Sequence, residues 1–325
     1  LTPAKANINN CFLSLSSNHK VLFGKDNPMI FSASGRTEIA GNHTDHNLGL
    51  VIGAAINLDT IAAVTKRDDM VINFCSEGFP KCTIDISDLE IKEEEKNTTA
   101  SLLRGVAKAF KDRGFDIKGF DANVTSKVLR GSGLSSSASV EVLIGEIFNS
   151  LYGEDSLSPV EIAKIGQYAE NVYFGKPSGL LDQLSCAYGG IVGIDFENKT
   201  EPKIEPISFD FSDYELEMVI TDTRGCHADL TDEYAAVPPE MREIAHYYGK
   251  ENLRQVDFNE FIRDMGKIRE KVKNDRAILR AYHFFKENDR VRYMLSELKE
   301  GDIDTFLYNV TESGNSSFRF LQNVY

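Results

Sequence analysis

The apolar positions of the chain follow two spacings, which predict a mixture of strands and helices. Residues 50–64 form a run rich in valine, isoleucine and alanine, and this run predicts one or two buried strands. In residues 101–110 and 140–151 the apolar side chains recur every three or four positions, which predicts two helices with one buried face each. Those faces consist of Leu103, Val106, Ala107 and Phe110 in the first helix and of Val140, Leu143, Ile144, Ile147 and Leu151 in the second.

A third helix is predicted from the residues of its first turn. Ser158 can cap it, Pro159 suits its first position, and Glu161 completes a capping box. We expect this helix to run to about Tyr173, because residues 175–179 then contain two glycines and a proline, which favour a turn.

The second half of the chain predicts strands followed by helices. Residues 215–221 alternate as a strand does, and residues 278–298 and 303–321 carry apolar side chains at helical spacing. Together with the first half, this order predicts an α+β fold. The length of 325 residues favours two domains. We place the boundary near residues 185–200 and assign the domains to residues 1–190 and 191–325.

Composition narrows the class of protein. With 36 lysines and arginines against 50 aspartates and glutamates, the formal net charge is −14, which argues against general binding of nucleic acid. No run of about 20 uncharged apolar residues occurs, and no signal peptide opens the chain, so we expect a cytoplasmic protein that does not bind membranes. The five cysteines include no C-x-x-C pair and indicate neither a disulfide framework nor a structural zinc site.

A glycine- and serine-rich loop at residues 131–139 directly precedes the helix of residues 140–151. Small residues allow a ligand to approach the backbone closely, and N–H groups at a helix start can bind anionic oxygens. The loop lacks the Gly-Lys-Ser/Thr ending of a Walker A motif. Phosphate binding is therefore our prediction for this loop, and a plain flexible connection is the alternative.

A second polar segment, residues 35–49, lies just before the predicted buried strand. It contains Arg36, Asn42, His43, Asp45 and His46 between glycines. Such a loop offers donors and acceptors to a polyhydroxylated ligand. Ligation of a metal by His43, Asp45 and His46 is one alternative, and a polar turn without function is another.

A third segment, residues 167–183, contains two carboxylates. Glu170 lies in the last turn of the predicted helix, and Asp182 follows the glycine–proline turn among leucines. A contact at a helix end and a capping aspartate are the purely structural interpretations of these two residues.

Taken together, the three segments resemble those of galactokinases, in the superfamily of galacto-, homoserine, mevalonate and phosphomevalonate kinases (GHMP kinases). Residues 35–49 resemble the family's sugar signature, residues 131–139 its phosphate loop, and residues 167–183 its catalytic segment. The order of the segments also matches, and weaker similarity continues through residues 222–234 and 280–325. The resemblance implies a two-domain GHMP-kinase fold. Its N-terminal domain is similar to domain 2 of ribosomal protein S5, its C-terminal domain is ferredoxin-like, and the active site lies between them.

The resemblance implies an ATP-dependent sugar 1-kinase, a phosphotransferase that converts ATP and D-galactose to ADP and galactose 1-phosphate. Asp182 is then the base or hydrogen-bond acceptor for the anomeric hydroxyl, and Arg36 is its electrostatic partner. Glu170, with Ser136 or Ser137, is expected to hold Mg²⁺. The expected ATP-binding residues are Gly131, Ser132, Gly133, Leu134, Ser135, Ser136, Ser137 and Ala138, and the expected sugar-binding residues are Asn42, His43, Asp45, Gly179 and Tyr234.

The sequence departs from the family pattern at two positions of the sugar signature. Asn42 stands where galactokinases usually carry glutamate, and His46 stands where tyrosine is usual. An asparagine removes a negative charge, so a sugar with a carboxylate at C6 would meet no like-charge repulsion there. Galacturonate is therefore an alternative substrate. Two further hypotheses are a regulator that binds sugar and ATP without turnover and a metal-dependent hydrolase.

The resemblance also gives expectations about binding partners, oligomeric state and the completeness of the chain. We expect sugar and ATP as small-molecule partners, and a monomer or a weak homodimer. The family's third motif, a glycine-rich strand and turn, has no counterpart before Tyr325. We therefore expect the chain to be a fragment whose second domain is incomplete.

Overall fold

The computed structural model describes residues 3–129, 131–221 and 231–323, and it describes their side chains except at residues 3–10, 231, 232 and 234. The chain divides into two compact units. Unit 1 comprises residues 1–36 and 55–189, and unit 2 comprises residues 37–54 and 190–325. Compactness thus groups residues 37–54 with the second half of the chain, whereas the domain limits 1–190 and 191–325 stay a prediction from the sequence.

Two long strands pass through both units, β1 (Met29–Ala40) and β2 (Leu50–Lys66). Unit 1 also contains α1 (Pro3–Phe23), β3 (Val71–Ser76), β4 (Cys82–Asp85), α2 (Thr99–Asp112), β5 (Phe120–Ser126), α3 (Ser136–Tyr152), α4 (Pro159–Tyr168) and α5 (Leu181–Tyr188). Unit 2 contains β6 (Ile191–Asp195), β7 (Lys203–Ile207), α6 (Thr231–Tyr247), α7 (Phe258–Val272), α8 (Asp275–Glu300) and α9 (Ile303–Ser316). In the described part of the chain, no helix has the length and apolarity needed to cross a membrane.

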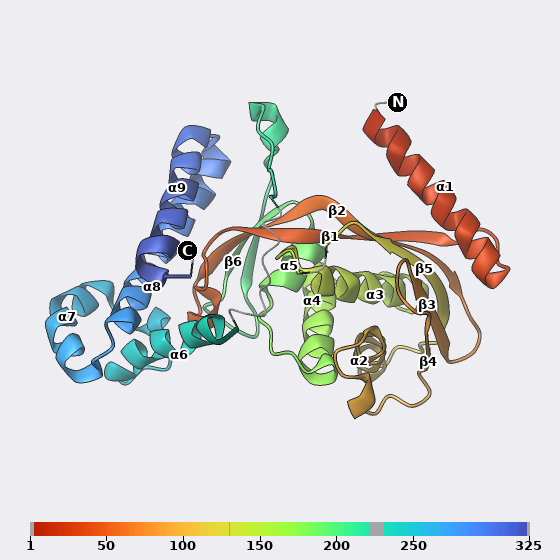
Figure 1. Ribbon diagram of the computed structural model, residues 1–325, viewed down its shortest axis with the longest axis horizontal. Helices are drawn as coiled ribbons and strands as arrows, with labels where there is room; N and C mark the ends of the chain where they lie inside the picture. The colour runs from red at the N-terminus through yellow and green to blue at the C-terminus, as the bar shows by residue number, and fades with distance from the viewer. Residues whose placement is uncertain (1–2, 130, 222–230, 324–325) are drawn as a thin grey trace. The chain divides into compact units, whose positions relative to one another are not determined.

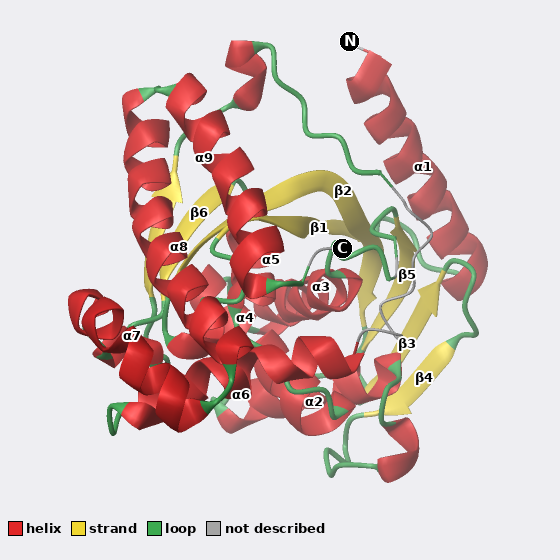
Figure 2. Cartoon of the chain, turned by 60° about the vertical axis from the view of Figure 1, so that its left-hand side comes forward, coloured by secondary structure: helices red, strands yellow, loops and turns green. Residues whose placement is uncertain are grey.

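The strands of unit 1 form a sheet with helices on both faces. The strand order is β4-β3-β5-β2, with β1 beside β2. Because successive side chains of a strand point to opposite faces, Ala62 and Val64 of β2 pack with α2 and α3, whereas Ile61 and Ala63 pack with α1. Accordingly, α1 lies on one side of these strands and α2, α3 and α4 lie on the other (Figure 1, Figure 2).

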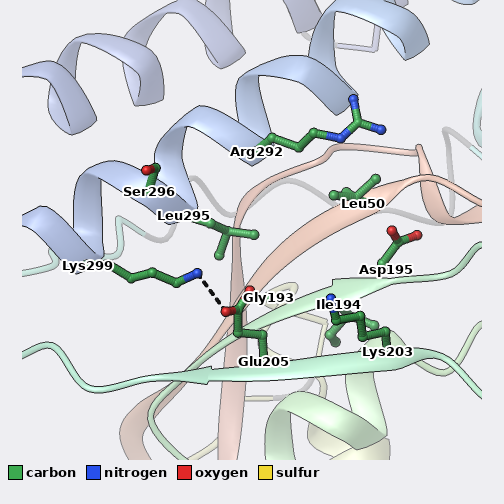
Figure 3. Close-up of a pocket in the computed structure, with 10 residues that line it drawn as sticks. All are labelled: Leu50, Gly193, Ile194, Asp195, Lys203, Glu205, Arg292, Leu295, Ser296 and Lys299. Carbon is green, nitrogen blue, oxygen red and sulfur yellow. Dashed lines mark ion pairs between the residues drawn. The ribbon is translucent and has the colours of Figure 1, made fainter.

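The strands of unit 2 belong to the same sheet through β2, and they pair antiparallel beside the longest helix of this unit. Residues 50–54 of β2 pair with β6, and β6 pairs with β7. Helix α8 lies directly on β6, where a Cβ on Gly193 would be 2.7 Å from the end of the Leu295 side chain, so glycine leaves room for that side chain. Figure 3 shows this contact and the adjacent ion pair, in which Lys299 Nζ lies 2.6 Å from Glu205 Oε1.

Most of the elements that the sequence predicts are present. The run at residues 50–64 is one strand, β2, and the helices expected around residues 101–110, 140–151, 278–298 and 303–321 are α2, α3, α8 and α9. The capping box of α4 is confirmed, because Ser158 Oγ accepts from the N–H of Glu161 while the Glu161 carboxylate accepts from the N–H of Ser158. The mixed α+β fold is confirmed as well.

The strand predicted at residues 215–221 is wrong. After a short 3₁₀ turn that ends at Tyr214, this segment has no regular structure in the described residues. The side chains of Met218, Val219 and Ile220 are 50%, 82% and 44% exposed. A strand is stabilised by its cross-strand partners, and none pairs with this segment in the part of the chain that the structure describes.

Two helices end in a π-helical turn that periodicity alone did not predict. Helix α4 passes into a π turn at Ala169–Phe174, and α9 passes into one at Ser317–Leu321. A π turn widens the helix by one residue and thereby changes the direction of the side chains that it carries, and such turns often occur at functional sites.

The aromatic core of unit 1 gives a test of this packing. Phe148 is fully buried, and its ring lies 5.4 Å from those of both Phe110 and Phe120. Phe148→Ala is expected to lower the free energy of unfolding by about 3–5 kcal/mol, because the cavity cannot close completely. Urea denaturation followed by circular dichroism measures this loss.

Phe79→Ala is the matched control, because the Phe79 side chain is 52% exposed. We expect it to cost about 1 kcal/mol or less. Equal losses in the two variants would contradict the assignment of Phe148 to the core.

Candidate functional site

A bidentate ion pair joins β1 to α5 in unit 1. Arg36 donates from Nε to Asp182 Oδ1 and from Nη2 to Asp182 Oδ2, both at 2.8 Å. The two side chains are 17% and 32% exposed. A guanidinium and a carboxylate paired in this way fix each other's orientation as well as their charges.

The glycine- and serine-rich loop closes around this pair. Arg36 Nη1 donates to the carbonyl of Gly133 at 2.5 Å, and the Arg36 N–H donates to the carbonyl of Leu134 at 3.1 Å. The strand and the loop can approach this closely because residue 35 is glycine, since a Cβ there would lie 2.9 Å from the Leu134 carbonyl oxygen. The Ser135 hydroxyl donates to Asp182 Oδ2.

These contacts keep Asp182 ionised. Burial by itself would raise the pKa of its carboxyl group, but the positive charge of Arg36 and the hydrogen bonds from Arg36 and Ser135 outweigh burial and hold the pKa below its ordinary value. Asp182 is therefore a carboxylate at neutral pH and can accept a hydrogen bond or a proton.

The loop leads into α3 without a side-chain cap. Gly131 and Gly133 have φ values of 72° and 78°, which glycine adopts readily. Ser135 precedes the helix, but its hydroxyl contacts Asp182 and makes no capping hydrogen bond. In the described residues the first N–H groups of α3 are thus left for an anion, as the prediction of a phosphate loop requires.

Glu170 lies in the π turn after α4, close to the start of α3. Its Oε1 atom accepts from Ser137 Oγ at 3.1 Å and from Lys176 Nζ at 2.9 Å, and its Oε2 atom accepts from Gln183 Nε2 at 3.0 Å. Although burial lowers the pKa of Lys176, the charge of Glu170 outweighs that effect and keeps the amine cationic. The buried Glu170 carboxylate and the Ser137 hydroxyl form a pair of oxygen donors of the kind that Mg²⁺ prefers.

In unit 2, buried side chains of α8 hold the loop of residues 41–50. Glu287 Oε1 accepts from the Gly41 N–H at 3.1 Å, and Asn288 Oδ1 accepts from the Leu50 N–H at 2.7 Å. His283 Nε2 lies 2.9 Å from the carbonyl oxygen of Asn42. Both ends of the loop are therefore tied to one helix.

The predicted sugar-binding residues on this loop differ in their surroundings. His43 is buried, and burial lowers its pKa to about 3, with smaller contributions from nearby His46, His283 and Arg280, so its ring is neutral at pH 7. Asp45 lies beside His46, with Oδ1 3.6 Å from Nε2. Asn42 donates from Nδ2 to Ser317 Oγ at 3.0 Å.

The structure thus brings the predicted residues together in two groups. Unit 1 holds Arg36, Asp182, Glu170 and the loop residues Gly131, Ser132, Gly133, Leu134, Ser135, Ser136, Ser137 and Ala138, with Gly179 exposed in the turn before α5. Unit 2 holds Asn42, His43 and Asp45 on one loop. Tyr234 lies in α6, but its side chain is outside the described residues, as are residues 222–230.

A cavity elsewhere in unit 2 does not involve these residues, and no further metal cluster is found in the described chain. This cavity of about 290 Å³ is lined by residues of β2, β6, β7 and α8, among them Lys203, Glu205 and Arg292, and by no predicted site residue (Figure 3). Within the described ranges, no group of three or more histidine, cysteine, aspartate or glutamate side chains is arranged to hold a metal ion.

Sequence reasoning missed several residues that hold these groups in place. Lys176, Gln183 and the α8 side chains His283, Glu287 and Asn288 all contact predicted site residues or their loops. The α8 residues could have been found from the sequence, because three polar side chains lie on the apolar face of an amphipathic helix. Such side chains are usually buried and hydrogen-bonded.

Comparison with known proteins identifies the family. The family model "GHMP kinases N terminal domain" matches residues 101–190, and the family model "Galactokinase galactose-binding signature" matches residues 17–66. The galactokinase of Clostridium tetani is 32% identical over 289 residues, which are 86% of this chain and 72% of that protein. The chain belongs to the galactokinase family. The resemblance inferred from the three motifs is thereby confirmed.

Further relatives agree with the family and its fold. The galactokinase of Streptococcus suis is 32% identical over 88% of this chain and 73% of its own length. The crystal structure of Lactococcus lactis galactokinase complexed with galactose superposes with a TM-score of 0.77 at 24% identity, covering 96% of this chain and 80% of that one. The protein is thus an enzyme of the phosphotransferase class, and the kinases of its family use ATP as co-substrate.

The buried neutral His43 predicts a pH-dependent stability. The unfolded chain takes up a proton on this ring below about pH 6.5, whereas the folded protein does so only near pH 3, so stability is lost as the pH falls through this range. Between pH 7 and pH 5 the wild type is expected to lose about 2 kcal/mol more than His43→Asn does, measured by urea denaturation. Asparagine tolerates the positive φ of 61° at this position.

His246→Asn is the control for this experiment, because His246 is exposed at the end of α6. It should retain the wild-type loss of stability between pH 7 and pH 5. A wild-type pH dependence in His43→Asn would show that His43 is not the group responsible.

Proposed function

We propose that this protein transfers the γ-phosphoryl group of ATP to the anomeric hydroxyl of D-galactose. The observation that carries this proposal is the Arg36–Asp182 pair, in which an ionised carboxylate lies against the phosphate loop of a galactokinase-family chain. A carboxylate in this position can accept the hydroxyl proton, and the adjacent guanidinium can offset negative charge on the transferred group.

The chemical step then assigns one role to each member of the pair. As the anomeric oxygen bonds to the γ-phosphorus, its proton passes to the Asp182 carboxylate, the bond from the γ-phosphorus to the bridging oxygen breaks, and ADP leaves. Arg36 keeps Asp182 ionised before transfer and orients both of its oxygens. The carbonyl of Gly133 in turn fixes the third guanidinium nitrogen.

Residues 131–138 are proposed to bind the phosphates of ATP. The uncapped N–H groups at the start of α3 and the positive end of the helix dipole favour anionic oxygens there. The side chain of Ser132 is engaged with the Leu129 carbonyl at 2.6 Å, which leaves this residue to contribute through its backbone.

Ser137 and Glu170 are proposed to hold Mg²⁺, with Ser137 preferred to Ser136 because its hydroxyl already lies 3.1 Å from the Glu170 carboxylate. When bound, the cation neutralises charge on the β- and γ-phosphates. Lys176 contacts the same carboxylate oxygen, so it would have to give up part of that contact when the metal and the nucleotide enter.

Asn42, His43, Asp45, Gly179 and Tyr234 are proposed to bind the sugar. One N–H of the Asn42 amide is donated to Ser317, which leaves the second N–H and the Oδ1 atom for a sugar. Its Oδ1 atom then remains to accept from a 6-hydroxyl, as the usual glutamate of the family would. The remaining N–H could equally donate to the C6 carboxylate of galacturonate, so it is the galactokinase relatives that support galactose as the substrate.

Steady-state assays of ADP release with galactose and with galacturonate test the proposed substrate. We expect kcat/KM to be at least about tenfold higher for galactose, which corresponds to one well-placed hydrogen bond. Release of ADP should depend on the sugar. A preference for galacturonate would overturn the proposed substrate, and sugar binding without ADP release would overturn the proposed reaction.

Asp182→Ala tests the proposed base. Its kcat is expected to fall by about 10²–10⁴, because the acceptor of the hydroxyl proton is lost, while the dissociation constant for galactose in calorimetry changes little. Asp116→Ala, at an exposed aspartate after α2, is the control and should retain wild-type kcat. If Asp182→Ala kept a sizeable fraction of wild-type kcat, the assigned role would be wrong.

A further inference from the structure

A fully buried carboxyl group lies behind the proposed metal site and has no role in the function described so far. Glu141 is 0% exposed and lies on α3, four residues after Ser137. Residues four apart share one face of a helix, so the helix that presents Ser137 also directs Glu141 toward the same side. Burying a carboxyl group is costly, and such a group usually has a specific partner.

That partner is Gln183, which follows Asp182 on α5. Gln183 Nε2 donates to Glu141 Oε2 at 2.9 Å and to Glu170 Oε2 at 3.0 Å, so its two amide hydrogens connect the two carboxyl groups. Gln183 is itself fully buried. The chain of contacts therefore runs from Glu141 through Gln183 to the oxygen of Glu170 that faces away from Ser137 and Lys176.

Two further oxygens indicate how Glu141 and Gln183 are paired. Glu141 Oε1 and Gln183 Oε1 are buried and have no hydrogen-bond partner among the described residues. Unprotonated, Glu141 therefore adds a second unmet acceptor to this pair of side chains, whereas a proton on its Oε1 atom would supply the missing donor.

The surrounding charges agree with a neutral Glu141. Burial, and then the negative charge of Glu170, raise its pKa well above the ordinary value, and Asp182 acts in the same direction. The hydrogen bond from Gln183 and the positive charge of Lys176 oppose this rise but do not outweigh it.

We propose that Glu141, through Gln183, is a positioning residue that fixes the Glu170 carboxylate for binding the metal–nucleotide complex. This inference rests on the proposed role of Glu170 in the kinase reaction. With Oε2 of Glu170 held by Gln183, only Oε1 faces Ser137, and the carboxylate cannot rotate to satisfy itself elsewhere. Outer partners that orient a metal ligand commonly change metal affinity when they are removed.

Three variants test the proposal. Glu141→Met keeps the unbranched shape but removes both hydrogen-bonding atoms, whereas Glu141→Gln keeps an acceptor for Gln183 Nε2 and supplies a donor for Gln183 Oε1. Glu146→Met changes the same residue type on the same helix, at a half-buried position, and it serves as the control. Calorimetry of ADP binding with and without Mg²⁺ gives the metal-dependent gain in affinity, and kinetics give the half-activating Mg²⁺ concentration and the KM for galactose.

In Glu141→Met we expect the metal-dependent gain in ADP affinity to fall by about tenfold and the half-activating Mg²⁺ concentration to rise by a similar factor. The affinity for ADP without Mg²⁺ and the KM for galactose should stay within about twofold, which a general loss of structure would not allow. Glu141→Gln should restore both metal-dependent values, and Glu146→Met should leave them at wild-type levels.

Two results would overturn the proposal. One is a Glu141→Met variant with unchanged Mg²⁺ dependence, and the other is a Glu141→Gln variant as impaired as Glu141→Met. Gln183→Met keeps the test decisive if Glu141→Met does not fold, because it should weaken the Mg²⁺ dependence in the same way. The ADP titrations need no sugar and no turnover, so failure of the proposed galactose reaction would be seen separately, in the wild type.

Discussion

The Arg36–Asp182 ion pair is the interaction on which the candidate site of unit 1 depends. It connects β1 to α5 across 146 positions of sequence, and it draws in the glycine- and serine-rich loop through the Gly133 carbonyl and the Ser135 hydroxyl. Breaking one partner of such a pair leaves the other charge partly buried and unpaired, which is far more costly than the pair itself is stabilising. The geometry of strand, loop and helix is therefore coupled through one guanidinium.

The same unit contains three carboxyl groups whose charges would repel one another in a partly buried site. Each of the three carboxyl groups has a different partner. Asp182 is paired with an arginine, Glu170 is paired with a lysine and a hydroxyl, and Glu141 is set against an amide. This separation of environments lets one carboxylate serve as acceptor, one as candidate metal ligand and one as neutral support within a short stretch of chain.

In unit 2, hydrogen bonds from helix α8 hold the loop of residues 41–50 in place. The side chains of His283, Glu287 and Asn288 bind backbone groups of residues 41–50, and Ser317 in the π turn after α9 binds the Asn42 side chain. Both π turns of the described chain thus carry a residue that contacts a candidate site, Glu170 in one and Ser317 in the other. The extra residue of a π turn redirects a side chain without ending the helix.

Local sequence patterns were sufficient for the helices α2, α3, α4, α8 and α9, for strand β2 and for the three motifs, but they did not predict α1, α5, α6 or α7. Amphipathic spacing, the Ser158–Glu161 capping box and the composition of the loops are read from neighbouring residues, and the order of the motifs was enough to indicate the galactokinase family. The strand expected at residues 215–221 is absent, because a local pattern is not sufficient to form a strand. A strand needs partners that are distant in sequence, and alternation within seven residues says nothing about whether those partners are present.

What only the tertiary structure decided is how the chemistry-bearing residues are paired. The sequence alone determined that Asp182, Glu170 and Arg36 are candidates, because their motifs are local. It did not reveal that Ser137 rather than Ser136 contacts Glu170, that Asn42 has one amide hydrogen engaged by Ser317, or that Glu141 is buried against Gln183. Such contacts join residues far apart in the chain, and their energy depends on burial and direction, which exist only once the chain has folded.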